Sequence, residues 1–108
     1  GLPHAVFIGH ERPGGRPLGF AEVSLREFAE GCRTSPVGYL EGWHVVEDAR
    51  RRGIGAALVG AGERWAATRG CSEFASDAEL DNPASLEAHA ALGFEPVADI
   101  RCFRKSLG

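Results

Sequence analysis

Two short runs of β-favouring residues open the chain. They cover residues 4–9 (HAVFIG) and 17–25 (PLGFAEVSL), and the ERPGGR between them has the proline and paired glycines of a hairpin turn. A longer run of the same kind, VGYLEGWHVV at 37–46, follows a polar loop. The pattern predicts an antiparallel hairpin followed by a third strand.

Beyond residue 50 the apolar spacing becomes helical. Apolar side chains recur at intervals of three and four between Ile54 and Trp65, and Gly70 stands where a C-terminal cap is expected. We therefore predict a helix over 52–69. The run CSEFASDA at 71–78 predicts a strand, so that 37–46, the helix and 71–77 form a βαβ unit with two parallel strands.

A second helix is predicted after this unit. Asn82 is a favourable N-cap, Pro83 occupies the first helical position, and Gly93 ends the helix. The tail from Phe94 to Leu107 is expected to add one or two closing strands. No repeat or interdomain linker interrupts the chain.

Composition sets the class of the protein. The 108 residues, 44% hydrophobic and 25% charged, are enough for one core, so we expect a single domain over 1–108. No apolar run reaches the roughly 20 residues that span a bilayer and no signal peptide is evident, so we expect no membrane partner and a cytoplasmic location. Cys32, Cys71 and Cys102 lack a CxxC pair, which argues against a disulfide framework or a metal site.

The charges are unevenly distributed. A net charge of −3 argues against nucleic acid as a partner. Between Ala49 and Arg69 there are five arginines and one acid, whereas between Gly70 and Ile100 there are seven acids and no Lys or Arg. This pattern suits an anionic ligand on one side and a cationic ligand on the other.

The segment RRRGIGAAL at 50–58 lies between a predicted strand and a predicted helix. Glycines allow a ligand to approach the backbone closely, and a helix N-terminus offers N–H groups to a pyrophosphate. A P-loop requires GxxxxGK[ST], and the dinucleotide fingerprint requires a glycine where Leu58 stands, so neither is supported. A helix start with surface arginines is the plain structural alternative.

With Arg50, Gly53 and Gly55, the segment resembles the (Q/R)xxGx(G/A) signature of the GNAT superfamily of N-acetyltransferases. The resemblance implies acetyl-CoA as cosubstrate, with its pyrophosphate on the loop amides and its pantetheine arm along the preceding strand edge. The implied cofactor-binding residues are His44, Val45, Val46, Arg51, Arg52, Gly53, Ile54, Gly55, Ala56, Asn82 and His89.

The segment DNPASLEAHAALGF at 81–94 resembles the second cofactor-binding segment of that superfamily. His89 stands four residues before Gly93, where many relatives have a tyrosine that protonates the departing thiolate. A histidine, with an ordinary pKa of about 6.5, suits that task near neutrality. A partly buried histidine on an apolar face, and an Asn82 that acts as an N-cap, are the structural alternatives.

Three carboxylates are candidate substrate contacts, with Asp77 near the mouth of the expected crevice and Glu41 farther back. Asp77 and Glu79 stand at the end of the second parallel strand, and ligand sites form at the C-terminal ends of such strands. Alternation places Glu41 on one face with Tyr39 and Trp43, and His44 on the opposite face. A carboxylate among aromatic rings suits an ammonium group. An exposed strand acid is the alternative interpretation of Glu41.

Three strings narrow the family: YLEGWHV, CSEFASDAELDN, and the run from NPASLEAHAALGFE to CFRKSL. Together they resemble the aminoglycoside 6′-N-acetyltransferases over nearly the whole chain. The resemblance implies a small cationic amine as substrate, bound by Glu41, Trp43, Asp77 and Glu79. We expect Asp77 to take the proton of the attacking amine, directly or through water, and His89 to assist thiolate departure.

The implied fold is α/β: a GNAT-like mixed, mostly antiparallel sheet, splayed at one parallel strand pair, with two main helices. The usual N-terminal strand and two helices, which complete one wall of the acceptor site, are missing. Together with the start at Gly1 and the lack of methionine, this predicts an N-terminally truncated chain. Its exposed sheet edge predicts a partner chain, and hence a homodimer.

The expected function is transfer of acetyl from acetyl-CoA to the 6′-amine of an aminoglycoside, which is an antibiotic-resistance activity. Three alternatives remain open from the sequence. The first is an acetyltransferase for another amine, such as a polyamine or a protein N-terminus. The second is a noncatalytic acyl-CoA-binding fragment. The third is an assembly domain that uses the exposed edge and binds no cofactor.

Overall fold

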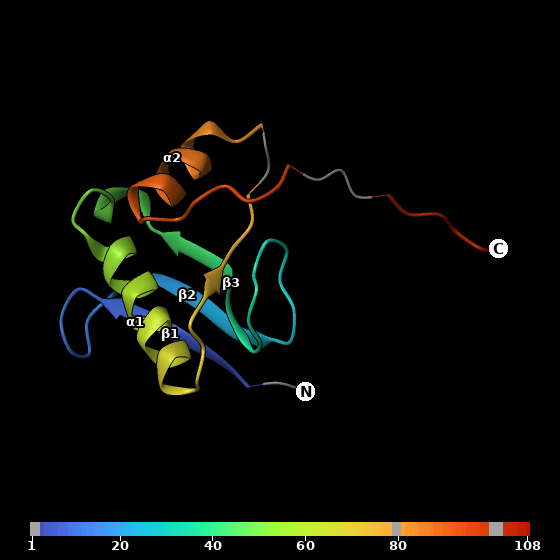
Figure 1. Cartoon of the computed structure of the whole chain (residues 1–108). Helices are drawn as coiled ribbons and strands as arrows, with labels where there is room; N and C mark the ends of the chain where they lie inside the picture. The colour runs from blue at the N-terminus through green and yellow to red at the C-terminus, as the bar shows by residue number, and fades with distance from the viewer. Residues whose placement is uncertain (1–2, 79–80, 100–102) are drawn as a thin grey trace. The chain divides into compact units, whose positions relative to one another are not determined.

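A computed structural model describes residues 3–78, 81–99 and 103–108 (Figure 1). The chain divides into two compact units, Gly1–Asp77 and Ala78–Gly108. Among the described residues, the first contains a sheet and a long helix, and the second contains a short helix. No helix in the described part of the chain is long and apolar enough to cross a membrane.

The sheet of the first unit has four strands. They are β1 (His4–His10), β2 (Pro17–Arg26), β3 (Val37–Val45) and β4 (Phe74–Ala75), in the order β1-β2-β3-β4. The first three are antiparallel neighbours, and β3 and β4 are parallel. The predicted mixed, mostly antiparallel sheet with one parallel pair is confirmed.

The parallel pair separates soon after it begins. β4 pairs with β3 only at Gly38 and Tyr39, although β3 continues to Val45. The predicted strand at 71–77 is therefore much shorter than expected. This splayed pair leaves one edge of β3 without β4 along its C-terminal part.

Helix α1 (Ile54–Thr68) covers one face of the sheet (Figure 1). Its buried residues, Leu58, Val59 and Ala66, face β-strand residues such as Val23 and Leu40 that are also buried. The helix begins two residues later than predicted because the preceding backbone is not helical. The short 3-10 helix η1 (Glu47–Ala49) links β3 to this loop.

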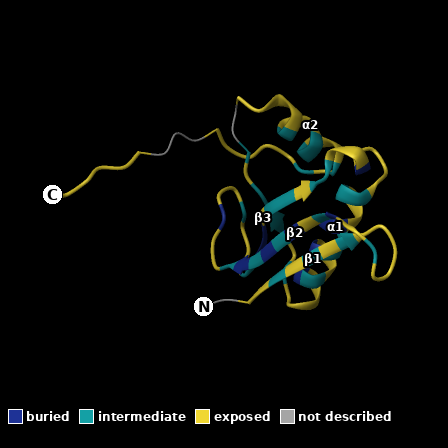
Figure 2. Ribbon diagram, turned by 180° about the vertical axis from the view of Figure 1, so that it is seen from behind, coloured by how far each residue is buried: buried dark blue, intermediate teal, exposed yellow. Residues whose placement is uncertain are grey.

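The opposite face of the sheet, called here the outer face, is only partly covered. Ala29, Val37 and Tyr39 form a small buried cluster there, with Cys32 and Ala75 packed against it. Elsewhere on this face apolar side chains are exposed, and Figure 2 shows how much of β1 is accessible. The exposed apolar residues of β1 and β2 are Val6, Ile8 and Phe20, at 51%, 56% and 39%.

The second unit contains helix α2 (Pro83–Ala91). The side chain of Asn82 accepts a hydrogen bond from the Ser85 N–H at 3.1 Å, and Pro83 stands in the first turn, so the predicted N-terminus is confirmed. Gly93 has φ 88° just after the helix.

The closing strands expected in the tail are not found. Residues 92–99 and 103–108 form no strand, and residues 100–102 lie outside the described part. Val97, Phe103 and Leu107 are 62%, 88% and 95% exposed. The prediction relied on β-favouring residues alone, but an isolated hairpin with no buried face is marginal in water.

Candidate functional site

The loop between β3 and α1 leaves the ordinary backbone regions at two residues. Arg51 has φ 65° and Gly53 has φ 78°, both left-handed. Gly53 is the N-cap of α1, and no side chain caps this end. The N–H groups from Ile54 to Ala56 therefore have no acceptor within the helix, and the helix dipole is positive there.

This end of α1 collects most of the predicted cofactor-binding residues. Arg51 and Arg52 are exposed beside it, and residues 51–56 are continuous with the first turn. Uncapped N–H groups, a positive dipole end and cationic side chains are the features that a pyrophosphate needs. Residues 51–56 thus lie together at this helix terminus, and their role in cofactor binding stays a prediction.

Gly55 has a packing role. A Cβ atom added there would lie 3.1 Å from Nε1 of Trp43 and 3.6 Å from Cγ2 of Val45. Only glycine lets α1 approach β3 this closely without a shift of the indole. The two glycines of the motif thus do different things, since Gly53 supplies a left-handed N-cap.

The end of β3 presents a backbone donor. The N–H of Val46 donates to the Leu18 carbonyl at 2.8 Å, and Gly19 is paired directly with Val45. In this antiparallel arrangement the N–H of Val45 points away from β2, to the edge where β3 and β4 diverge. The carbonyl of Val45 accepts a hydrogen bond from Nε of Arg50 at 3.0 Å, which ties the loop to the strand.

A β-bulge interrupts the pairing of β2 with β3. Glu22 pairs with Gly42 and Val23 pairs with Leu40, so Glu41 is an extra residue in β3. Such a bulge reverses the alternation of faces for the residues beyond it.

The bulge corrects the expected grouping of Glu41 with Tyr39 and Trp43. Tyr39 is paired with Ser24 on the outer face, whereas Trp43 is paired with Ala21 on the face that α1 covers. The shared face was wrong for Trp43, because strict alternation does not hold across the extra residue. Trp43 lies against Gly55 and not beside the acids.

The bulge also corrects the placement of His44, expected on the face opposite Tyr39 and Glu41. Its ring lies on the outer face with Phe20, with ring centroids 6.3 Å apart. Its imidazole is therefore on the opposite face of the sheet from α1.

Glu41 is held in an ion pair that the sequence did not reveal. Arg26 at the end of β2 donates through Nη2 to Oε1 at 2.7 Å and through Nε to Oε2 at 3.0 Å, and the Ser24 hydroxyl also donates to Oε2. The hydrogen bonds from Arg26 are the main cause of a lowered pKa for Glu41. The signal for Arg26 was its shared strand face with Ser24, which becomes informative only once the register with β3 is known.

Asp77 is linked to the same group of side chains through Tyr39. The phenol of Tyr39 donates to Oδ2 of Asp77 at 2.8 Å, and the guanidinium carbon of Arg26 lies 3.5 Å from the centre of the Tyr39 ring. Burial and then the hydrogen bond to Asp77 raise the pKa of Tyr39 to about 12. The outer face thus joins the two predicted acids, Glu41 and Asp77, in one network.

His89 in α2 has a defined proton position. Its Nδ1 lies 2.7 Å from the Ser85 carbonyl oxygen, which can only accept, so Nδ1 carries the hydrogen. In the neutral ring, Nε2 is then an acceptor. The ring packs against Phe94 with centroids 5.2 Å apart, so His89 is partly buried as the structural alternative anticipated.

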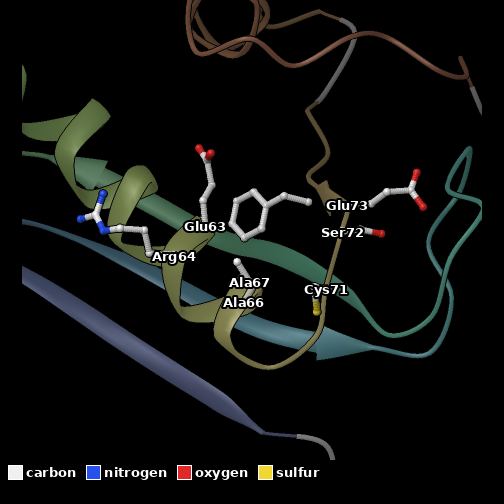
Figure 3. Close-up of a pocket in the computed structure, with 8 residues that line it drawn as sticks. Glu63, Arg64, Ala66, Ala67, Cys71, Ser72 and Glu73 are labelled. Atoms are coloured by element: carbon white, nitrogen blue, oxygen red, sulfur yellow. The ribbon is translucent and has the colours of Figure 1, made fainter.

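A groove of the first unit lies away from these residues. It has a volume of about 320 Å³ and runs between α1 and the segment before β4, where Figure 3 shows Glu63 and Arg64 at one rim and Cys71 and Ser72 at the other. None of the predicted site residues lines it.

Among the described residues no group of three or more His, Cys, Asp or Glu side chains is placed to hold a metal ion. Glu79 lies outside the described residues.

The fold, the loop at the start of α1 and the splayed strand pair define an acetyltransferase. Residues 2–94 match the Acetyltransferase (GNAT) family, and the chain belongs to this family. The resemblance predicted from the sequence is confirmed.

Particular relatives are aminoglycoside-modifying enzymes. The chain is 57% identical over 105 residues to an aminoglycoside N(6′)-acetyltransferase type 1 of Klebsiella aerogenes, covering 97% of this chain and 68% of that protein. A protein of the same name from Serratia marcescens is 46% identical over 92 residues, with 84% and 63% covered. The chain thus spans about two thirds of the length of these relatives.

Solved structures of aminoglycoside 6′-N-acetyltransferases are also similar to this chain. AAC(6′)-Iy in complex with the bisubstrate analog CoA-S-monomethyl-acetylneamine superposes with a TM-score of 0.90 at 39% identity, covering 96% of this chain and 70% of that one. AAC(6′)-Ih from Acinetobacter baumannii has a TM-score of 0.90 at 38% identity, with 97% and 71% covered.

Proposed function

We propose that this chain transfers the acetyl group of acetyl-CoA to the 6′-amine of an aminoglycoside antibiotic. The observation that carries the proposal is the 57% identity, over 105 residues, to an aminoglycoside N(6′)-acetyltransferase type 1. That match extends over 97% of the chain, so it spans the loop, the acids and α2 together.

The cofactor side of the reaction is assigned to the first turn of α1 and the end of β3. The uncapped N–H groups at Ile54–Ala56 and the exposed Arg51 and Arg52 fit the pyrophosphate of acetyl-CoA. The outward N–H of Val45 is an oxyanion-hole donor for the thioester carbonyl oxygen, whose negative charge grows as the amine attacks.

The acceptor side is assigned to the acids. The neutral amine nitrogen forms a bond to the thioester carbon, and the carbon–sulfur bond then breaks, which yields an acetamide and CoA thiolate. The amine proton passes to the carboxylate of Asp77, directly or through one water. Glu79 adds negative charge for the remaining ammonium groups of the substrate, and Glu41 contacts them while it shares its charge with Arg26.

His89 is assigned to the thiolate. Because Nδ1–H is committed to the Ser85 carbonyl, proton donation through Nε2 requires the imidazolium form of the ring. Asn82 is assigned to the same segment, and its N-cap role is compatible with it.

The test is release of CoA thiol with acetyl-CoA and two aminoglycosides that differ only in a 6′-amine or a 6′-hydroxyl. Turnover with the amine alone supports both the chemistry and the position. Turnover with polyamines but neither aminoglycoside favours another amine as substrate. Absence of any turnover, with acetyl-CoA binding retained in calorimetry, favours a noncatalytic acyl-CoA-binding fragment.

We further propose a homodimer in the cytoplasm. β1 is the edge strand of the sheet, and its Val6 and Ile8 are more than half exposed, which supports pairing with a second copy. Sedimentation equilibrium tests the dimer: a monomer mass at all concentrations contradicts it.

The two described cysteines, Cys32 and Cys71, are free thiols, as expected for a protein in a reducing compartment such as the cytoplasm.

A further inference from the structure

Asp77 accepts a hydrogen bond from Tyr39. Asp77 is exposed and follows β4 by two residues, in a segment without regular hydrogen bonding. Tyr39 is only 8% exposed and belongs to the buried cluster with Ala29 and Val37. Its hydroxyl donates to Oδ2 of Asp77 at 2.8 Å, so a buried residue of β3 contacts a residue of an irregular segment.

Tyr39 is in turn fixed from its other side by Arg26. The guanidinium lies 3.5 Å above the centre of the phenol ring, while its nitrogens hold both oxygens of Glu41. Cation–π contact and a two-point ion pair both favour one orientation of Arg26. The two acids assigned to the acceptor site are therefore held at one spacing by Arg26 and Tyr39.

The direction of the hydrogen bond has a chemical consequence. Tyr39 donates to one carboxylate oxygen, which leaves the other oxygen of Asp77 to receive a proton. Burial and the hydrogen bond to Asp77 raise the pKa of Tyr39 to about 12, so the phenol keeps its proton and stays a donor at neutral pH.

We propose that Tyr39 is a positioning residue of the acetyl transfer, which orients the carboxylate of Asp77 toward the attacking amine. The inference rests on the proposed function, because it assumes that Asp77 is the base. Tyr39 itself touches neither reacting atom in this assignment.

Kinetics of three variants test the proposal. Tyr39→Phe removes the hydroxyl and keeps the ring under Arg26, so kcat is expected to fall about 10-fold or more with the KM for acetyl-CoA unchanged. Asp77→Ala removes the carboxylate, and adding Tyr39→Phe to it is expected to cause no further loss, because Tyr39 acts through Asp77. Multiplied losses in the double variant, or an unchanged kcat in Tyr39→Phe, would overturn the proposal.

Thr68→Val is the matched control. It also removes a hydroxyl hydrogen bond, from Thr68 Oγ1 to the Trp65 carbonyl at 2.7 Å on α1, but lies outside the acid network. It is expected to leave kcat unchanged. Thermal melting of all variants shows whether a loss of kcat reflects unfolding, and a Tyr39→Phe chain that melts like the original and turns over equally fast contradicts the inference.

A spectroscopic arm separates this inference from the proposed function. Tyr39 is the only tyrosine in the chain, so the tyrosine doublet in ultraviolet resonance Raman spectra reports its hydroxyl alone. The doublet is expected to show a donor in the original chain and to change in Asp77→Ala at neutral pH. An unchanged doublet in Asp77→Ala overturns the contact between Tyr39 and Asp77. If the doublet changes but the original chain transfers no acetyl group, the contact holds and the proposed function has failed instead.

Discussion

The carboxylate of Glu41 accepts two hydrogen bonds from the guanidinium of Arg26, at 2.7 and 3.0 Å, across the antiparallel pair of β2 and β3. A negative site on the outer face is thus neutralised by the protein itself. A cationic substrate that contacts Glu41 either displaces the guanidinium of Arg26 or shares the carboxylate with it.

The ion pair predicts a pH-dependent contribution to stability. The pKa of Glu41 is lowered from 4.5 in the folded state, so its contribution is present at neutral pH and is lost as pH falls through the lowered pKa. Arg26→Met is expected to lower the free energy of unfolding by about 1 kcal/mol at pH 7, a figure reduced for partial exposure. Urea denaturation at pH 7 and at acid pH measures it, and the difference from the original chain should shrink at acid pH.

The matched control for that prediction is Arg16→Met. Arg16 pairs with Asp48 at 3.2 Å, but the two side chains are 50% and 66% exposed. Its loss is expected to change the free energy of unfolding by less than about 0.5 kcal/mol. Equal losses in both variants would show that Arg26 has no special role in stability.

Asp77→Asn tests the base. With the carboxylate gone, the amine proton has no acceptor at this position, and kcat is expected to fall about 10²- to 10⁴-fold. Acetyl-CoA affinity in calorimetry should stay the same, because the first turn of α1 is unchanged. Undiminished turnover at every pH would remove Asp77 as the base.

Two glycines of α1 should respond oppositely to alanine. Gly55→Ala puts a Cβ 3.1 Å from Nε1 of Trp43, so a destabilisation of about 1–3 kcal/mol and weaker acetyl-CoA binding are expected. Gly60→Ala meets only the flexible end of Arg64, at 3.3 Å, and should stabilise the helix by about 0.5–1 kcal/mol. Chemical denaturation measures both, and a neutral Gly55→Ala would contradict the packing role.

The hydrogen bond to Ser85 predicts the tautomer of His89. In the neutral ring, Nδ1 is expected to carry the proton and Nε2 to be unprotonated. Nitrogen-15 chemical shifts of the imidazole, followed through its titration, distinguish the two nitrogens. A neutral form protonated at Nε2 would contradict this geometry and the need for the imidazolium in thiolate protonation.

Local chemistry made much of the fold predictable. The hairpin turn, the apolar spacing of α1 and the N-cap pair Asn82 and Pro83 act over a few neighbouring residues, and each predicted element near them is present. The loop signature at Arg50, Gly53 and Gly55 is equally local, which is why the family followed from residue identities.

The acid network required contacts between residues far apart in the chain. Arg26, Tyr39 and Asp77 meet because strand register places Ser24 opposite Tyr39 and β4 beside β3. The extra residue at Glu41 moved Trp43 to the other face, and residues 94–99 formed no strand despite β-favouring side chains. Register, bulges and strand pairing depend on partners supplied by the rest of the sheet, so no window of the sequence specifies them.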